Sequence, residues 1–133
     1  MTGMETLRLC RASLEAMDRQ AADVEMLKGL CDAEVNQQTM EQIIRQREQS
    51  GEVLRGQKQM YTMRSNDALK VLRRLQGREK RVLWMYYVLG MTIKTISANM
   101  GLNYRDVLKC KAKAIKTLED TEEDEHESSD DHR

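Results

Sequence analysis

The side chains of this chain that could engage a partner chemically are the basic ones between Asn103 and Leu118. Apolar or small residues recur there at helical spacing and predict one buried stripe: Val107, Cys110, Ala114 and Leu118. The opposite side of the same helix is basic or small: Tyr104, Arg105, Lys109, Ala112, Lys113 and Lys116, with Lys111 at the border. Cations on such a helix can pair with phosphates, and its small side chains let it enter the major groove of DNA.

A short helix and a glycine turn precede this basic helix and must hold it at a steep angle. Thr92 can cap the short helix, whose Ile96 is expected to face inward. Gly101 can adopt a left-handed conformation without steric cost, and Asn103 is a favourable N-cap for the next helix. These signals predict a helix-turn-helix with its recognition helix at about residues 103–118.

Two further short helices are predicted upstream, each ending at a glycine. Asn66 or its neighbour Ser65 can cap the first helix, whose leucines stop at Gly77, and the second helix closes at Gly90. Together with the helix-turn-helix they make a four-helix domain over residues 65–118. The expected fold class is all-α, because proline and phenylalanine are absent and good helix formers dominate the composition.

The zero net charge of the 133 residues conceals a strong asymmetry along the chain. Residues 65–118 hold 12 basic and 3 acidic side chains, a net +9, whereas residues 1–64 hold 9 basic and 10 acidic ones. The basic block is where a polyanion would be attracted. Residues 119–133 hold 1 basic and 9 acidic side chains, a net −8, and are expected to be a disordered acidic tail. This tail would either keep the protein soluble or compete with DNA for the basic helix.

Residues 1–64 are expected to form a helical arm. Apolar or small side chains follow a 3-4 spacing through residues 4–35, interrupted at Lys28: Leu7, Cys10, Leu14, Met17, Ala21, Val24, Cys31 and Val35. This apolar seam favours either a dimerising coiled coil or an intramolecular helical hairpin. Gly51 and Gly56 leave open whether the later part of the arm is one kinked helix or two short ones.

The stretch from Asn66 to Leu118 resembles region 4 of sigma-70-type transcription factors, the four-helix domain that binds the −35 promoter element. The resemblance lies in a leucine-rich first helix followed by the motifs RExxVLxMYY, GMTxxxIS and MGLN. The last motif, YRxVLxxxxKAIxxL, is more similar to small phage and prophage late-gene regulators of the RinA/ArpU type. Those regulators also tend to carry a charged helical N-terminal segment before the motif.

The resemblance implies a set of DNA-reading positions on the last helix: Asn103, Tyr104, Arg105, Leu108, Lys109 and Ala112. Two positions depart from the family pattern, because Ser97 replaces the usual alanine and Lys111 replaces a usually buried leucine. Lys113 and Lys116 are expected to pair with phosphates. Four more cations are candidates either for DNA-backbone contacts or for an ordinary solvated surface: Lys94, Arg78, Lys80 and Arg81.

Nothing in the sequence points to an enzyme or to a cofactor. It has no glycine-rich phosphate loop, no histidine within a predicted folded stretch, and no paired carboxylates on an apolar face. Its three cysteines lie far apart without a CxxC pair, so neither a disulfide framework nor a metal site is indicated. We expect a reduced, non-catalytic protein that acts by binding.

The sequence therefore predicts a sequence-specific DNA-binding transcriptional regulator of the phage or prophage type. Its expected partners are double-stranded DNA, RNA polymerase, and a second copy bound through the N-terminal helices. No apolar run is long enough to span a bilayer and no signal-peptide core is present, so the cytoplasm of a bacterial or phage-infected cell is expected. The alternative is a non-catalytic assembly module that binds RNA polymerase or viral packaging partners, as a small terminase subunit does.

Overall fold

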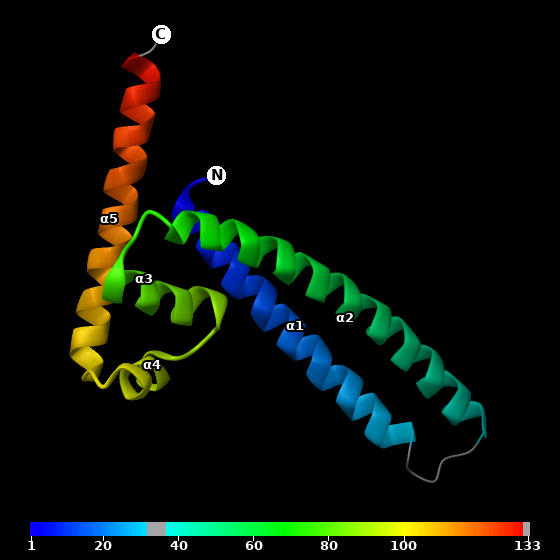
Figure 1. Ribbon diagram of the computed structural model, residues 1–133. Helices are drawn as coiled ribbons and strands as arrows, with labels where there is room; N and C mark the ends of the chain where they lie inside the picture. Colours follow the sequence, from blue (N-terminus) through cyan, green and yellow to red (C-terminus); the bar gives the residue numbers. More distant parts are fainter. Residues whose placement is uncertain (32–36, 132–133) are drawn as a thin grey trace.

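A computed structural model of the chain describes residues 1–31 and 37–131, with side chains described at 1–27, 29 and 41–122. Within these ranges every regular element is a helix, so the predicted all-α fold class is confirmed (Figure 1). The elements in order are α1 (Gly3–Cys31), α2 (Gln37–Leu72), α3 (Gly77–Leu83), the π-helical turn η1 (Trp84–Val88), α4 (Ile93–Met100) and α5 (Tyr104–Asp131). None of the helices in the described ranges combines the length and the apolar character that crossing a bilayer requires.

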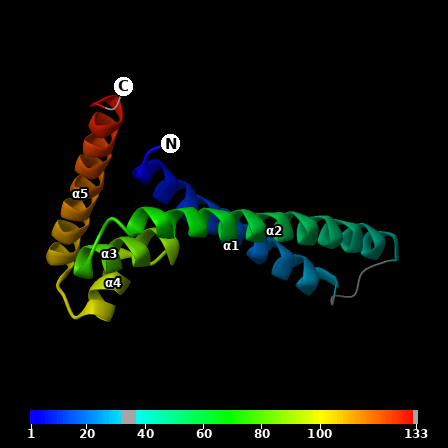
Figure 2. The ribbon, with the colours of Figure 1, turned by 45° about the horizontal axis from the view of Figure 1, so that its top comes forward.

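Helices α1 and α2 form an antiparallel hairpin that leads away from the other helices (Figures 1 and 2). The predicted apolar seam is the side that α1 buries: Leu7 and Cys10 are buried, and four later members are half-buried, namely Leu14, Met17, Ala21 and Val24. The Gln20 amide also donates to the Ser50 carbonyl across the hairpin, at 3.1 Å. The intramolecular hairpin is therefore the alternative that the structure shows. Lys28, Cys31 and Val35 lie outside the described side chains.

Helix α2 is one continuous helix of 36 residues that runs through both Gly51 and Gly56. Each glycine costs about 1 kcal/mol relative to alanine in a helix interior. The long contact with α1 offsets that cost, because tertiary packing contributes more to helix stability than propensity does. The helix also continues past residue 64, so the prediction of a separate helix capped by Ser65 or Asn66 is wrong.

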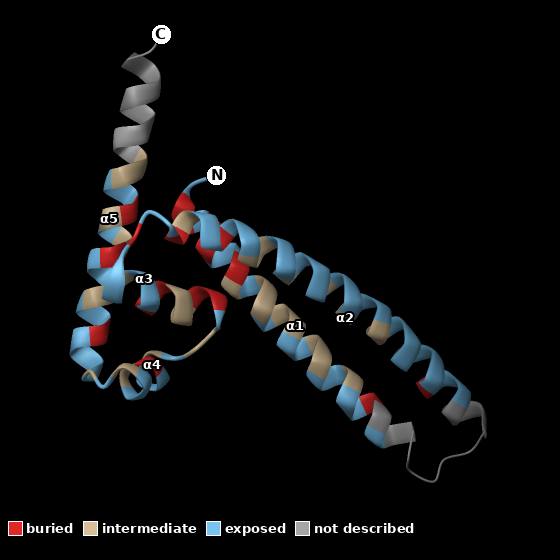
Figure 3. Cartoon of the chain, in the orientation of Figure 1, coloured by how far each residue is buried: buried red, intermediate tan, exposed pale blue. Residues whose placement is uncertain are grey.

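One hydrophobic core joins the hairpin to the helices that follow it. Met4, Leu7 and Cys10 of α1 are buried together with residues from α2 onwards: Ala68, Leu72, Leu75, Leu83, Tyr87, Val88, Ala114 and Leu118. Buried residues gather where the hairpin meets α3 and α5 and become sparse along the hairpin (Figure 3). The boundary predicted between an arm at 1–64 and a domain at 65–118 falls inside α2, and residues from both sides of it share this core.

A second, smaller core lies beneath the helix-turn-helix. Val82, Ile96 and Val107 are fully buried there and bring α3, α4 and α5 together. Half-buried side chains close its edges: Met85, Tyr86, Met91, Ile93, Met100, Leu102 and Cys110. The inward orientation predicted for Ile96 is thus confirmed, and α5 is anchored at both ends of its apolar stripe.

Between α3 and α4 the backbone forms the wider, π-helical turn η1. The Leu89 amide donates to the Trp84 carbonyl at 3.1 Å, five residues earlier, instead of the usual four. The Tyr61 hydroxyl of α2 donates to the Val88 carbonyl at 2.5 Å, so the hairpin holds this turn. Gly90 ends the segment with φ +70°, as its predicted role as a helix stop requires.

The glycines provide a test of this geometry, because Gly56 and Gly90 should respond to alanine in opposite directions. Gly56 is helical with open space around an added Cβ, so Gly56→Ala should stabilise the fold by about 0.5–1 kcal/mol. At Gly90, with φ +70°, an added Cβ would lie 2.5 Å from Leu14 Cδ2, so alanine should destabilise by at least about 1 kcal/mol. Urea unfolding followed by circular dichroism measures both changes. Shifts of the same sign in the two variants would contradict the described backbone.

Helix α5 continues past the predicted end at Leu118 as far as Asp131, so the structure describes helix over most of the stretch predicted as a disordered tail from residue 119. A tertiary contact contributes to this continuation. The Glu122 carboxylate accepts a hydrogen bond from the Gly3 backbone amide and lies 3.4 Å from the Arg74 guanidinium. A carboxylate is favourable at the N-terminus of a helix such as α1, and glutamate is itself a good helix former.

Candidate nucleic-acid interface

The helix-turn-helix is held by short-range hydrogen bonds at three positions. The Thr92 hydroxyl accepts from the Thr95 amide at 3.2 Å and caps α4. Gly101 ends α4 in the left-handed conformation, with φ +65° and ψ +29°, and the Asn103 Oδ1 accepts from the Asp106 amide at 2.8 Å to cap α5. The predicted caps and the predicted glycine turn are confirmed.

Ser97, one of the two departures from the family pattern, has a specific role in this turn. It is half-buried, and its hydroxyl donates to the Leu102 carbonyl, while the Leu102 amide donates to the Ser97 carbonyl at 3.2 Å. The serine therefore ties the end of α4 to the residue just before the α5 cap. An alanine at this position would fill the same space without the side-chain bond.

The inner side of α5 is the apolar stripe that the sequence predicts. Val107, Ala114 and Leu118 are fully buried, and Cys110 is half-buried. Burial raises the pKa of the Cys110 thiol, and the nearby Glu79 carboxylate adds to the rise, while Arg78 and Lys113 oppose it. This stripe fixes which side of α5 can face a ligand.

The outer side of α5 presents every residue that the sequence assigns to DNA binding. All eight are exposed: Asn103, Tyr104, Arg105, Leu108, Lys109, Ala112, Lys113 and Lys116. Two apolar members of this set keep substantial exposed fractions, 56% for Tyr104 and 40% for Leu108. The structure therefore brings the predicted set together on one accessible helix face, which we call the α5 basic face.

Glu79 of α3 borders the α5 basic face and was not singled out by the sequence. Its carboxylate lies 3.6 Å from the Lys113 ammonium and accepts a hydrogen bond from the Thr117 hydroxyl at 3.5 Å. Arg78 precedes it in the first turn of α3 and is exposed. Of the four candidate backbone cations, Arg78 is thus adjacent in sequence to the residue that pairs with the basic face.

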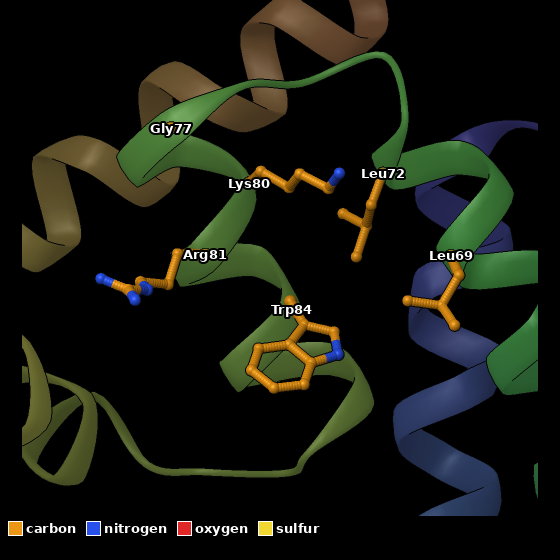
Figure 4. A pocket seen from close by; sticks show the side chains of 6 residues that line it. All are labelled: Leu69, Leu72, Gly77, Lys80, Arg81 and Trp84. Carbon is orange, nitrogen blue, oxygen red and sulfur yellow. The ribbon is translucent and has the colours of Figure 1, made fainter.

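Lys80 and Arg81, also on α3, are exposed and line an open hollow of about 310 Å³ between α3 and the end of α2. Figure 4 shows that the two side chains point in different directions, with Lys80 directed toward Leu72. Trp84 lies in the same hollow and is half-buried. The tryptophan therefore lies on the α2 side of the core, and Lys80 belongs to this hollow and not to the α5 basic face.

Lys94 and Lys111 differ in their surroundings, although both were near the predicted interface. Lys94 is exposed in the first turn of α4. Lys111 is half-buried, and its ammonium lies 4.3 Å from the ring centroid of Tyr86 and 5.8 Å from that of Tyr87. Lys111, where the sigma-region-4 pattern that the sequence resembles has a buried leucine, is thus directed toward an aromatic face that can receive its charge.

In comparisons with known proteins, the chain matches no family model, no curated protein and no solved structure. The resemblance to sigma region 4 therefore rests on the sequence motifs.

Proposed function

We propose that this protein is a sequence-specific, double-stranded-DNA-binding transcriptional regulator of the phage or prophage type, and that the α5 basic face enters the major groove. The observation that carries this proposal is the exposure of all eight predicted residues on a helix whose opposite side is locked into the core. A rigid helix with cations and small side chains outward satisfies both the shape and the charge of the groove.

Within this face, the residues divide between phosphate and base contacts. Lys109, Lys113 and Lys116 pair with phosphates, which position the protein without reading sequence. Arg105, in the first turn of α5, is placed for a bidentate contact with guanine. Because Asn103 Oδ1 is occupied by the helix cap, the side-chain amide nitrogen of Asn103 is the group available to a base or phosphate.

Two cations outside α5 extend the proposed contact. Arg78 lies in the first turn of α3 next to Glu79, which pairs with Lys113 of the basic face. Lys94 lies at the start of α4, the helix that crosses the DNA backbone in this docking geometry. Lys113 must release its pairing with Glu79 or share it with a phosphate. The Lys113 side chain is 78% exposed and the Glu79 side chain 22% exposed, so Lys113 can turn to a phosphate while Glu79 keeps its hydrogen bond from Thr117.

A single unit of this size reads few base pairs, so useful affinity requires a second DNA-bound copy or RNA polymerase alongside. The first turns of the hairpin pack against α5, and the rest of it leads away from α5 (Figures 1 and 2). We place the protein in the cytoplasm of a bacterial or phage-infected cell, where both the DNA and the polymerase are found.

Selection of bound fragments from a random DNA pool by the full chain tests this proposal. We expect enrichment of one sequence, and with about three to five phosphate contacts the log affinity for it should fall with log salt at a slope of about −3 to −4.5. Light scattering on the same sample gives the mass of the bound form. Retention of all sequences equally, together with a ring-sized oligomer, would replace the regulator with the assembly module.

A further inference from the structure

Tyr86 of η1 contacts both the hairpin and the recognition helix. The Arg11 guanidinium of α1 lies 3.9 Å from the Tyr86 ring centroid, and the Lys111 ammonium of α5 lies 4.3 Å from it. Tyr87 packs edge-on against the same ring, with 4.8 Å between centroids and an interplanar angle of 84°. One aromatic side chain thus receives two cations, from α1 and from α5, that are 100 residues apart in sequence.

Arg11 also holds the backbone that leads into the helix-turn-helix. Its Nη1 donates to the Tyr86 carbonyl at 2.5 Å and to the Met91 carbonyl at 3.3 Å, just before the Thr92 cap of α4. The Glu15 carboxylate accepts from Arg11 Nε at 3.2 Å and fixes the guanidinium from the other side. One side chain, Arg11, therefore links α1 to the backbone just before α4.

Lys111 fixes α5 against the same ring. It lies only two residues after Lys109, yet Lys109 is exposed and Lys111 is half-buried against Tyr86. A small rotation of α5 about its axis would withdraw the ammonium from the ring. The buried stripe already sets which side of α5 faces outward, and this contact adds a restraint against small rotations that would change the direction in which Arg105 and Lys109 point.

We propose that Arg11 and Lys111 are positioning residues, which orient the α5 basic face through Tyr86, and that Lys111 makes no phosphate contact. The part that concerns DNA rests on the proposed function. The hairpin is then a component of the DNA-binding unit, because its first turns set the angle of the recognition helix. This positioning role accounts for a lysine at position 111, where the sigma-region-4 pattern has a buried leucine.

The salt dependence of DNA binding distinguishes positioning from phosphate contact. Lys111→Met keeps the length of the side chain and removes the charge, so it should weaken specific binding at least about tenfold at every salt concentration without changing the slope. Lys109→Met is the matched control, and its slope should become shallower by about 0.9 because one phosphate contact is lost. Lys111→Arg should restore the affinity. A slope change of about 0.9 for Lys111→Met, or unchanged affinity, would overturn the proposal.

The contribution of Arg11 is tested by a variant and a matched control on the same helix. Arg11→Met should shift the binding curve in parallel, as Lys111→Met does, although it lies on another helix. Arg8→Met, which removes an exposed arginine one turn earlier on α1, should leave both affinity and slope unchanged. Tyr86→Phe keeps the ring and should bind as the wild type does, whereas Tyr86→Leu should show the parallel loss.

A measurement without DNA separates this inference from the proposed function. In the full chain, amide hydrogen exchange over residues 104–111 should be faster in Lys111→Met and in Arg11→Met than in Arg8→Met, with overall helix content unchanged. If the wild type binds no DNA while these exchange rates still rise, the proposed function fails and the positioning role remains. Exchange rates equal to those of Arg8→Met would overturn the positioning role, whatever the DNA result.

Discussion

Replacing both Arg105 and Lys109 by alanine should abolish sequence-specific DNA binding and leave the helix content unchanged. Both side chains are exposed on α5, so their removal opens no cavity. Loss of a bidentate guanine contact costs about 1–3 kcal/mol of discrimination. Loss of one phosphate contact also reduces the steepness of the salt dependence by about 0.9. Together we expect the specific affinity to fall by more than about 100-fold.

A mobility-shift titration with the selected fragment and with a scrambled fragment measures this loss. The matched control is the pair Arg55→Ala and Lys58→Ala, which removes the same charge from exposed positions of α2 on the hairpin. That control should retain its preference for the selected fragment. Specific binding by the Arg105 and Lys109 double variant at the wild-type level would eliminate α5 as the reading helix.

Leu7→Ala should destabilise the whole chain by about 3–4 kcal/mol and not only the hairpin. Leu7 has no exposed surface and is buried with Leu72 and Leu118, so the substitution opens a cavity between α1, α2 and α5. Because one core joins the hairpin to the helix-turn-helix, the two parts should unfold together. A drop in melting temperature of about 10 °C is expected for a chain of this size.

Two probes in one urea titration report on that cooperativity. Far-ultraviolet circular dichroism follows the long helices, and the fluorescence of Trp84, the only tryptophan, follows the core beside η1. The two transitions should coincide in the wild type and in Leu7→Ala. Leu9→Ala, two residues further along α1 and 36% exposed, should shift both unfolding transitions by much less. Separate transitions would show that the hairpin and the helix-turn-helix are independent units.

The local parts of the candidate site were predictable because they depend on neighbours within a few residues. Thr92 bonds to the amide three residues ahead, and Asn103 does the same at the start of α5. Gly101 needs only its own backbone conformation. The buried stripe through Val107 and Leu118 follows from the helical period. Such signals are contained in a short window of sequence, so the helix-turn-helix and its exposed face could be read directly.

The predictions that differ from the structure concern places where a distant contact outweighs the local preference for a helix end. Ser65 is a good helix cap by type, but packing against α1 carries α2 through it to Leu72. The acidic residues after Leu118 have little apolar surface, yet Glu122 contacts the amide at the start of α1. In both cases the partner lies more than 50 residues away, and composition in a short window carries no information about it.

The sequence alone determined that the chain is helical, where the turn before α5 falls, and which face of α5 carries its cations. Only the tertiary structure decided that the hairpin and the helix-turn-helix share a core, and that the Lys111 ammonium lies against the Tyr86 ring. Lys109 and Lys111 are two residues apart, so the helical period already turns them to opposite sides of α5. What lies on the Lys111 side depends on a distant segment, and the Tyr86 ring stabilises the half-buried ammonium by replacing part of its hydration.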